Sequence, residues 1–124
     1  MKSDDLMRGD YVLHNGNVIK VAAVHKRKIG YHVRPDKLTW LFENQFEPIE
    51  VTKEILIKNN FEFNELDNFC WITDNTYWED GEVRTYEDAY ICEGKYVHQL
   101  QHLFSLTPEK HRIKYNKQNY DLVV

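Results

Sequence analysis

The chain has 124 residues, of which 42% are hydrophobic and 29% charged, and its formal net charge is −4. This length suits one domain or two very small ones. No apolar run approaches the roughly 20 residues that a membrane-spanning helix requires, and the polar start MKSDDLMRGD lacks the apolar stretch of a signal peptide. The sequence therefore predicts a cytoplasmic protein without membrane contact, in which Cys70 and Cys92 are reduced thiols.

The N-terminal part has the pattern of a small antiparallel β-structure. GDYVLHNGNVIKVAAV places strand-like runs on either side of Asn15-Gly16, a dipeptide that tolerates positive φ at both central positions of a hairpin turn. The runs KIGYHV, LTWLF and FEPIEV follow, and short strands in such close succession are typical of small barrels. The opening hairpin resembles that of SH3-like barrels such as KOW and Tudor modules. We therefore predict an SH3-like antiparallel β-barrel over residues 1–51.

A second subdomain is predicted over residues 52–124. The hydroxyl of Thr52 can cap the first turn of a short helix from Lys53 to Lys58. Strands are expected at 69–73, in two fragments of 77–86 around Asp80-Gly81, and at 89–92. A last helix, near residues 96–106, is expected to pack on this antiparallel sheet. The predicted fold class is α+β, with a barrel followed by a helix–β-sheet–helix unit.

Two histidines in the stretch VHQLQH have the spacing of the zinc-binding motif H-E-x-x-H. The second position of that motif is Gln99 here, and a neutral amide cannot take a proton from metal-bound water. At about 100° per residue the apolar side chains of the helix form one stripe, and His98 and His102 lie on the opposite side. We interpret them as solvated histidines, with no metal and no catalytic residue. A metal-dependent hydrolase using both remains an alternative, although no spacing indicates a third ligand.

The same stretch carries a resemblance to a protein family. VHQLQHLFSLTPEK, together with EPIEVTKEILIKNNFEF, resembles short uncharacterised proteins encoded by bacterial phages and mobile elements. Those proteins have a run like V-H-x-L-Q-N-L-Y-F-A-L-T-G near the C-terminus and a segment like P-I-x-L-T-x-x-x-L-x-x-x-G-F in the middle. His102 stands at the group's Asn position, and Asn60 stands where the group has Gly. The resemblance implies a fold and a genomic setting, but no reaction.

Basic side chains gather in the predicted barrel, where residues 1–42 carry 8 basic and 4 acidic side chains. Nucleic acid is one candidate partner, because basic side chains contact phosphates while the rings of Tyr31 and Trp40 stack on bases. The candidate phosphate-binding residues are Lys26, Arg27, Lys28 and Arg34. The alternative interpretation is a charged turn that protects a sheet edge from aggregation.

Acidic side chains dominate the middle of the chain, where residues 43–93 carry 14 acidic and 3 basic side chains. Such a face either occupies a basic partner, in the manner of a nucleic-acid mimic, or is simply solvated.

The favoured function is that of a non-enzymatic binding or accessory protein of a bacterial phage or mobile element. The sequence lacks a nucleophile motif and a glycine-rich phosphate loop, so no catalytic residue and no cofactor are predicted. We expect contacts with an unidentified protein partner, while the oligomeric state stays open. The aromatic candidates for the interface are Trp40, Trp78 and Tyr86. The nucleic-acid-binding module and the metal-dependent hydrolase are the two alternatives.

Overall fold

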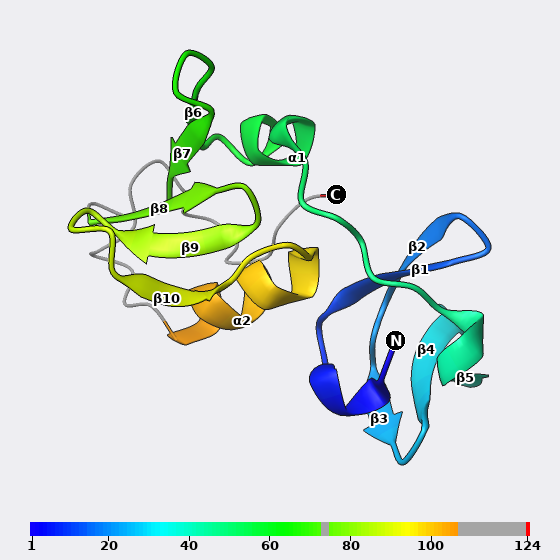
Figure 1. Ribbon diagram of the computed structural model, residues 1–124. Coiled ribbons are helices and arrows are strands. Elements are labelled where there is room, and N and C mark those ends of the chain that lie inside the picture. The colour runs from blue at the N-terminus through cyan, green and yellow to red at the C-terminus, as the bar shows by residue number, and fades with distance from the viewer. Residues whose placement is uncertain (73–74, 107–123) are drawn as a thin grey trace. The chain divides into compact units, whose positions relative to one another are not determined.

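The computed structural model describes residues 1–72, 75–106 and 124 (Figure 1). The chain divides into two compact units, Met1–Ile49 and Glu50–Val124, called unit 1 and unit 2 below. The sequence places this boundary two residues later, after residue 51. The described elements are mostly strands with two α-helices, which confirms the α+β class.

Unit 1 is built from short antiparallel strands. Its elements are the 3-10 helix η1 (Ser3–Asp5), β1 (Tyr11–His14), β2 (Asn17–Lys20), β3 (Ala23–His25), β4 (Lys28–Arg34), β5 (Lys37–Phe42) and the 3-10 helix η2 (Glu43–Gln45). The first hairpin turns at Asn15 and Gly16, with φ of 51° and 79°. These values confirm the turn that the sequence predicts, because Asn and Gly accept this backbone region most readily.

The sheets of unit 1 are open and do not close into a barrel, so the SH3-like barrel predicted from the sequence is not confirmed. Strands β1 and β2 form one sheet, and β3, β4 and β5 form another. Val21 and Ala22 separate β2 from β3. The sequence pattern predicts one continuous strand-like run over this part of the chain. The run FEPIEV forms no strand and supplies two isolated bridges, one between Glu47 and Leu13 and one between Glu50 and Tyr96. Pro48 explains part of this difference, because proline has no N–H to donate to a strand ladder.

The core of unit 1 lies against one face of the β3–β4–β5 sheet. Cross-strand partners share a face, so the pairs of Ile29 with Leu41 and with Val24 define the inner side. The buried core residues are Leu6, Val12, Val21, Ile29, Leu41 and Phe46. The opposite side of the same sheet carries none of these residues.

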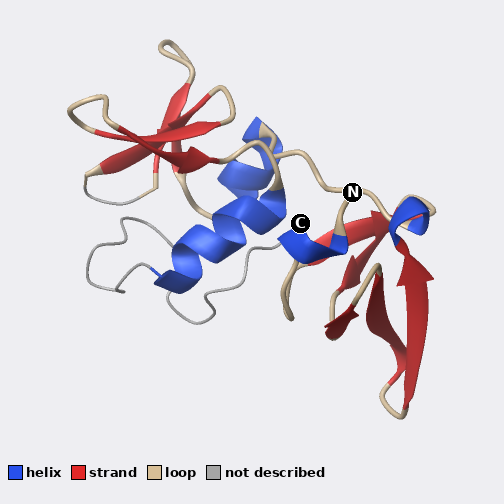
Figure 2. Ribbon diagram, turned by 60° about the horizontal axis from the view of Figure 1, so that its bottom comes forward, coloured by secondary structure: helices blue, strands red, loops and turns tan. Residues whose placement is uncertain are grey.

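Unit 2 combines a five-stranded antiparallel sheet with two helices. Its elements are α1 (Lys53–Lys58), β6 (Glu62–Asn64), β7 (Phe69–Trp71), β8 (Thr76–Glu79), β9 (Glu82–Thr85), β10 (Tyr90–Glu93) and α2 (Val97–Leu106). The strand order is β10-β9-β8-β7-β6. The hydroxyl of Thr52 accepts a hydrogen bond from the Ile55 N–H at 3.2 Å, which confirms the predicted cap. Figure 2 shows both helices on the same side of this sheet.

Helix α2 packs tightly against the inner side of the sheet at Gly94. A Cβ atom at this glycine would lie 3.0 Å from Trp78 and from Val83, and 3.2 Å from Leu100 of α2. The Trp78 indole N–H donates to the Gly94 carbonyl oxygen at 2.7 Å. Helix α2 and the sheet therefore pack closely at Gly94 because this residue has no side chain, and a larger residue would crowd this contact. Further along α2, the buried ring of Phe104 stacks on Phe61 with centroids 5.6 Å apart.

Cys70 is fully buried in this core, and burial raises the pKa of its thiol to about 12, with a smaller contribution from the Glu62 carboxylate. The thiol holds its proton more tightly in the folded protein than in the unfolded chain. Its contribution to stability is therefore present below pH 9 and lost as the pH rises towards 12. We expect native Cys70 to resist iodoacetamide at pH 8 and the free energy of unfolding to fall between pH 9 and pH 12.

Mass spectrometry of alkylated protein and urea denaturation at several pH values measure these two effects. In a Cys70→Ala variant the alkaline loss of stability should be smaller. Rapid alkylation of Cys70 in the native protein at pH 8 would contradict the burial.

Candidate nucleic-acid interface

The outer side of the β3–β4–β5 sheet combines aromatic, aliphatic and cationic side chains. The strand register places Lys28 opposite Phe42, Gly30 opposite Trp40 and His32 opposite Leu38. It also places His25 opposite Lys28 and Ala23 opposite Gly30. These residues share one side of the sheet because directly paired residues share a face. We call this surface the β3–β5 face, and its members are Ala23, His25, Lys28, Gly30, His32, Leu38, Trp40 and Phe42.

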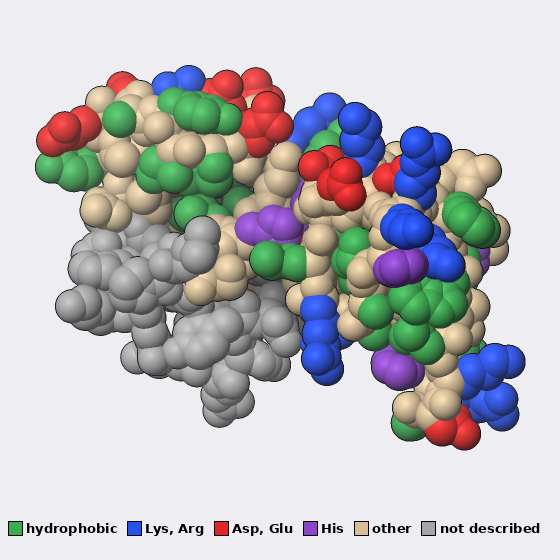
Figure 3. All heavy atoms as spheres, turned by 90° about the horizontal axis from the view of Figure 1, so that it is seen from below, with side chains coloured by type: hydrophobic (Ala, Val, Ile, Leu, Met, Phe, Trp, Pro, Cys, Tyr) green, Lys and Arg blue, Asp and Glu red, His purple; other side chains and the backbone are tan. Residues whose placement is uncertain are grey.

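Two large rings of the β3–β5 face are open to solvent. Trp40 is 41% exposed and Phe42 is 61% exposed. Exposed aromatic side chains are uncommon away from binding surfaces when several lie together. Figure 3 shows hydrophobic side chains of unit 1 with histidine and Lys or Arg side chains next to them. The face is therefore neither a purely apolar patch nor a purely charged one.

Trp40 lies between a cation and a histidine. The Lys28 ammonium is 5.2 Å from the centroid of the Trp40 ring, within the range of a cation–π contact. The His25 ring lies edge-on to Trp40, with centroids 6.4 Å apart. Gly30 is opposite Trp40 and leaves room for the Leu38 side chain, which lies 3.0 Å from where a Cβ would be. A side chain at position 30 would therefore displace Leu38 from the centre of the face.

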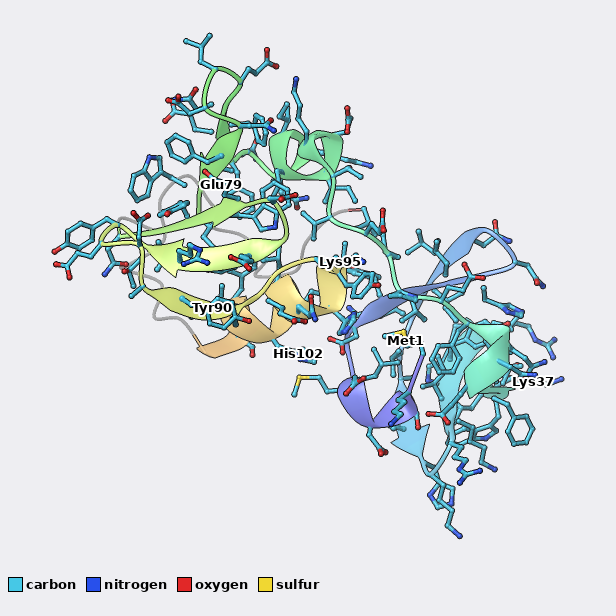
Figure 4. All side chains as sticks on the ribbon, in the orientation of Figure 1. Met1, Lys37, Glu79, Tyr90, Lys95 and His102 are labelled. Carbon is cyan, nitrogen blue, oxygen red and sulfur yellow. The ribbon has the colours of Figure 1, made fainter. Side chains whose placement is uncertain are left out.

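The predicted phosphate-binding residues fall into two groups. Lys26 and Arg27 form the two-residue turn between β3 and β4, and Lys28 follows directly. Arg34 ends β4, six residues from Lys28, which corresponds to roughly 20 Å along a strand. The structure therefore brings Lys26, Arg27 and Lys28 together but places Arg34 at the other end of the β3–β5 face. Figure 4 labels Lys37 beside that end, at the start of β5.

None of these four basic side chains forms an ion pair with a described residue. Over residues 20–42 the chain carries six basic side chains and one acidic side chain. A local excess of this kind attracts polyanions, even though the whole chain is acidic.

The structure corrects the prediction for Tyr31. This ring is half-buried and packs against the core of unit 1. Tyr31 pairs with Thr39, one register position away from the pair of Gly30 with Trp40, so the two rings point to opposite sides of the sheet. Tyr31 therefore cannot share a stacking platform with Trp40. The residues that sequence reasoning missed are Leu38 and Phe42, although the alternation of Leu38, Trp40 and Phe42 in β5 is the signal that identifies them.

The other two interface candidates differ in their environment. Trp78 is half-buried on the inner side of the unit 2 sheet, where its indole N–H bonds to Gly94. That contact gives Trp78 a packing role. Tyr86, by contrast, is 63% exposed in the segment between β9 and β10, so its ring is accessible.

The structure contradicts the solvated interpretation of His98. The helix forms as predicted, but His98 is only 5% exposed and His102 is half-buried. The His98 ring stacks on Tyr96 with an interplanar angle of 11°, and it meets His102 edge-on with centroids 5.8 Å apart. Helix α2 is thus covered on more than its apolar stripe, which periodicity alone does not reveal.

The part of the chain that the structure describes contains no group of three potential metal ligands among its His, Cys, Asp and Glu side chains. A third ligand for His98 and His102 is therefore not found among those residues. Residues 107–110 of the VHQLQHLFSLTPEK segment lie outside the described residues.

Comparison of the chain with protein-family models, with curated proteins and with solved structures found no match. Neither α1 nor α2, the helices in the described residues, has the length and apolar character needed to cross a membrane.

Proposed function

We propose that the chain is a non-enzymatic binding protein whose unit 1 binds single-stranded nucleic acid through the β3–β5 face. The observation that carries this proposal is the exposed Trp40 ring, flanked by Lys28 and His25 on an open sheet surface. Unstacked bases bind by stacking on aromatic side chains, while Lys and Arg contact the phosphates along the strand. The β3–β5 face offers both kinds of contact, with cations at its two ends.

A single strand fits this surface better than a duplex. Bases in a duplex are already stacked on one another, so they are not available to an aromatic ring on a flat sheet. A sheet surface with exposed rings is a known way to bind single strands. The SH3-like character expected of unit 1 is part of the same proposal, since small β-modules of several kinds use sheet surfaces in this way.

Salt-dependent binding of an oligonucleotide tests this function. We expect unlabelled protein to raise the fluorescence anisotropy of a labelled 20-nucleotide DNA or RNA single strand. The logarithm of the affinity should fall linearly with the logarithm of the salt concentration, by about 0.7 per phosphate contacted. Replacing Lys26, Arg27 and Lys28 with alanine removes up to three contacts, so it should weaken binding strongly and reduce that slope by roughly 2.

The matched control for the alanine variant replaces three basic side chains elsewhere: Lys2, Lys53 and Lys58. It lowers the net charge equally and should leave the slope unchanged. Absence of binding to both DNA and RNA at low salt would refute the proposed function.

The wider role that we propose is that of an accessory protein of a bacterial phage or mobile element. It is supported by the resemblance of the VHQLQHLFSLTPEK and EPIEVTKEILIKNNFEF segments to that group of proteins. Binding of a protein partner is a second candidate function. It is favoured by the aromatic and acidic side chains on the sheet of unit 2, which have no part in the β3–β5 face of unit 1.

A further inference from the structure

The outer side of the unit 2 sheet carries two rows of side chains that run across its strands. The strand register places Phe69, Glu79, Glu82 and Glu93 in successive cross-strand pairs, and it places Trp71, Tyr77, Arg84 and Tyr90 in the next ones. Cys70, Trp78 and Val83 occupy the alternate positions and face the core. The two rows therefore share the side of the sheet that faces away from α2.

One half of this outer side is aromatic. The rings of Phe69, Trp71 and Tyr77 contact one another edge-to-face, with centroids 5.7 to 5.8 Å apart. All three are partly exposed. We call them the aromatic cluster. The faces of such rings carry negative electrostatic potential, so they attract Lys and Arg side chains.

The other half is acidic. Glu79 is directly opposite Glu82, and Glu82 is directly opposite Glu93, so three carboxylates line up across β8, β9 and β10. We call them the acidic row. Like charges in directly opposite positions destabilise a sheet. A bound cation would relieve this repulsion.

Arg84 already partly neutralises the acidic row. Its guanidinium lies 2.6 Å from the Glu82 carboxylate and 5.9 Å from the ring of Tyr90. The pair raises the pKa of Arg84, mainly through the hydrogen bond to Glu82. Arg84 therefore shows how an arginine is held on this surface, with its charge on a carboxylate and its plane near a ring. Glu79 and Glu93 are both exposed, and the Glu93 carboxylate accepts a hydrogen bond from the Gln99 side-chain amide of α2 at 3.4 Å.

Two hollows border the acidic row. One of about 400 Å³ includes Glu82, Tyr90 and Glu93 in its lining, and one of about 450 Å³ includes Tyr77, Glu79 and Glu82. Each is large enough for a side chain of a partner. Figure 4 labels Glu79 on β8 and Tyr90 on β10, at the two sides of this region.

We propose that this outer side of unit 2 binds a polypeptide segment of another protein that carries several Lys or Arg side chains. The carboxylates of the acidic row pair with the charged groups of the partner's Lys and Arg side chains. The rings of the aromatic cluster pack against the aliphatic parts of these side chains and form cation–π contacts with neighbouring ones. Charge complementarity selects this occupant, because an anionic nucleic acid would be repelled by the same carboxylates. The proposal is independent of the function proposed for unit 1.

Titration with a lysine octapeptide, measured by isothermal calorimetry at low and at physiological salt, tests the proposal. The variant Glu79→Gln/Glu82→Gln/Glu93→Gln removes the acidic row and should weaken binding roughly 3- to 150-fold, since each exposed ion pair contributes about 0.2–1 kcal/mol. The control Asp4→Asn/Glu47→Gln/Glu54→Gln changes the net charge equally and should alter the affinity less than about twofold. The Lys26, Arg27 and Lys28 alanine variant should bind the peptide normally, which separates this test from that of unit 1.

Amide chemical shifts of the unaltered protein give a second measurement that does not depend on any variant. The peptide should perturb residues of β7, β8, β9 and β10 and leave β3, β4 and β5 unchanged. Equal loss of affinity in the two triple variants would mean unspecific attraction to an acidic chain and would overturn the proposal. Shifts confined to unit 1, or absence of binding at low salt, would overturn it as well.

Discussion

Replacing Trp40 with alanine is expected to weaken single-strand binding by one to two orders of magnitude. Stacking of one base on an aromatic side chain contributes about 1–3 kcal/mol, and Trp40 is the ring that the β3–β5 face presents between Lys28 and His25. Because Trp40 is 41% exposed, its removal should lower the free energy of unfolding by less than the roughly 3–5 kcal/mol that a fully buried aromatic side chain costs. The anisotropy titration and a urea denaturation curve measure these two quantities on the same sample.

Two variants separate stacking from other effects of losing a large ring. Trp40→Phe keeps an aromatic surface and should retain most of the affinity. Tyr86→Ala removes an exposed ring from unit 2 and should leave oligonucleotide binding unchanged. If Trp40→Ala bound the oligonucleotide as tightly as the unaltered protein, base stacking at this face would have no part in the function.

Replacing Phe104 with alanine is expected to lower the free energy of unfolding of unit 2 by about 3–5 kcal/mol, the usual cost of removing a fully buried aromatic side chain. Phe104 is completely buried and stacks on Phe61, so its removal leaves a cavity between α2 and the segment that follows α1. Hydrogen exchange of amides in β7, β8 and β9 reports on unit 2 separately from unit 1. Amides of β3 and β4 should keep their protection.

Ile57→Ala is the control for Phe104→Ala. Ile57 is 49% exposed on α1, so its truncation should cost less than about 1 kcal/mol. A similar small cost for Phe104→Ala would show that α2 does not supply the core of unit 2.

Helix ends and turns could be predicted from the sequence where one or two neighbouring residues determine the local backbone conformation. Thr52 caps α1, which spans the predicted residues Lys53–Lys58. Asp80-Gly81 turns the chain between β8 and β9 with φ of 48° and 80°. In these cases the side chain or the backbone freedom of one or two residues decides the outcome. Strand β6 was not predicted, since three residues are too few to show a period.

Longer-range features could not be predicted, because they depend on partners far away along the chain. The alternation in KIGYHV and LTWLF predicts two strands, but it does not say whether the sheet closes. The burial of His98 depends on what surrounds α2, whereas the helical period describes only the helix itself. The placement of Trp40 and Tyr31 on opposite sides followed only from the pairing of β4 with β5.

The sequence shows an excess of basic or acidic side chains in the segments that form the two candidate surfaces, but it does not show which of these side chains lie next to one another. Lys26, Arg27 and Lys28 stood out as a charged run, yet their relation to Trp40 needed the fold. The 14 acidic side chains of residues 43–93 gave no indication that Glu79, Glu82 and Glu93 lie in register. Cross-strand register is a property of the folded sheet, and a shift of one residue would place these carboxylates on the other side.

The tight fit at Gly94 has an evolutionary consequence. Because a Cβ at this position would lie 3.0 to 3.2 Å from Trp78, Val83 and Leu100 at once, a larger residue here requires those neighbours to shift by a few tenths of an ångström or to be replaced by smaller ones. Any divergent descendant of this gene that keeps unit 2 should therefore retain glycine here or show paired substitutions at the contacting positions. The residues at positions 78, 83, 94 and 100 together then form a sequence signature for finding related proteins in genomes, and this signature does not depend on the two histidines.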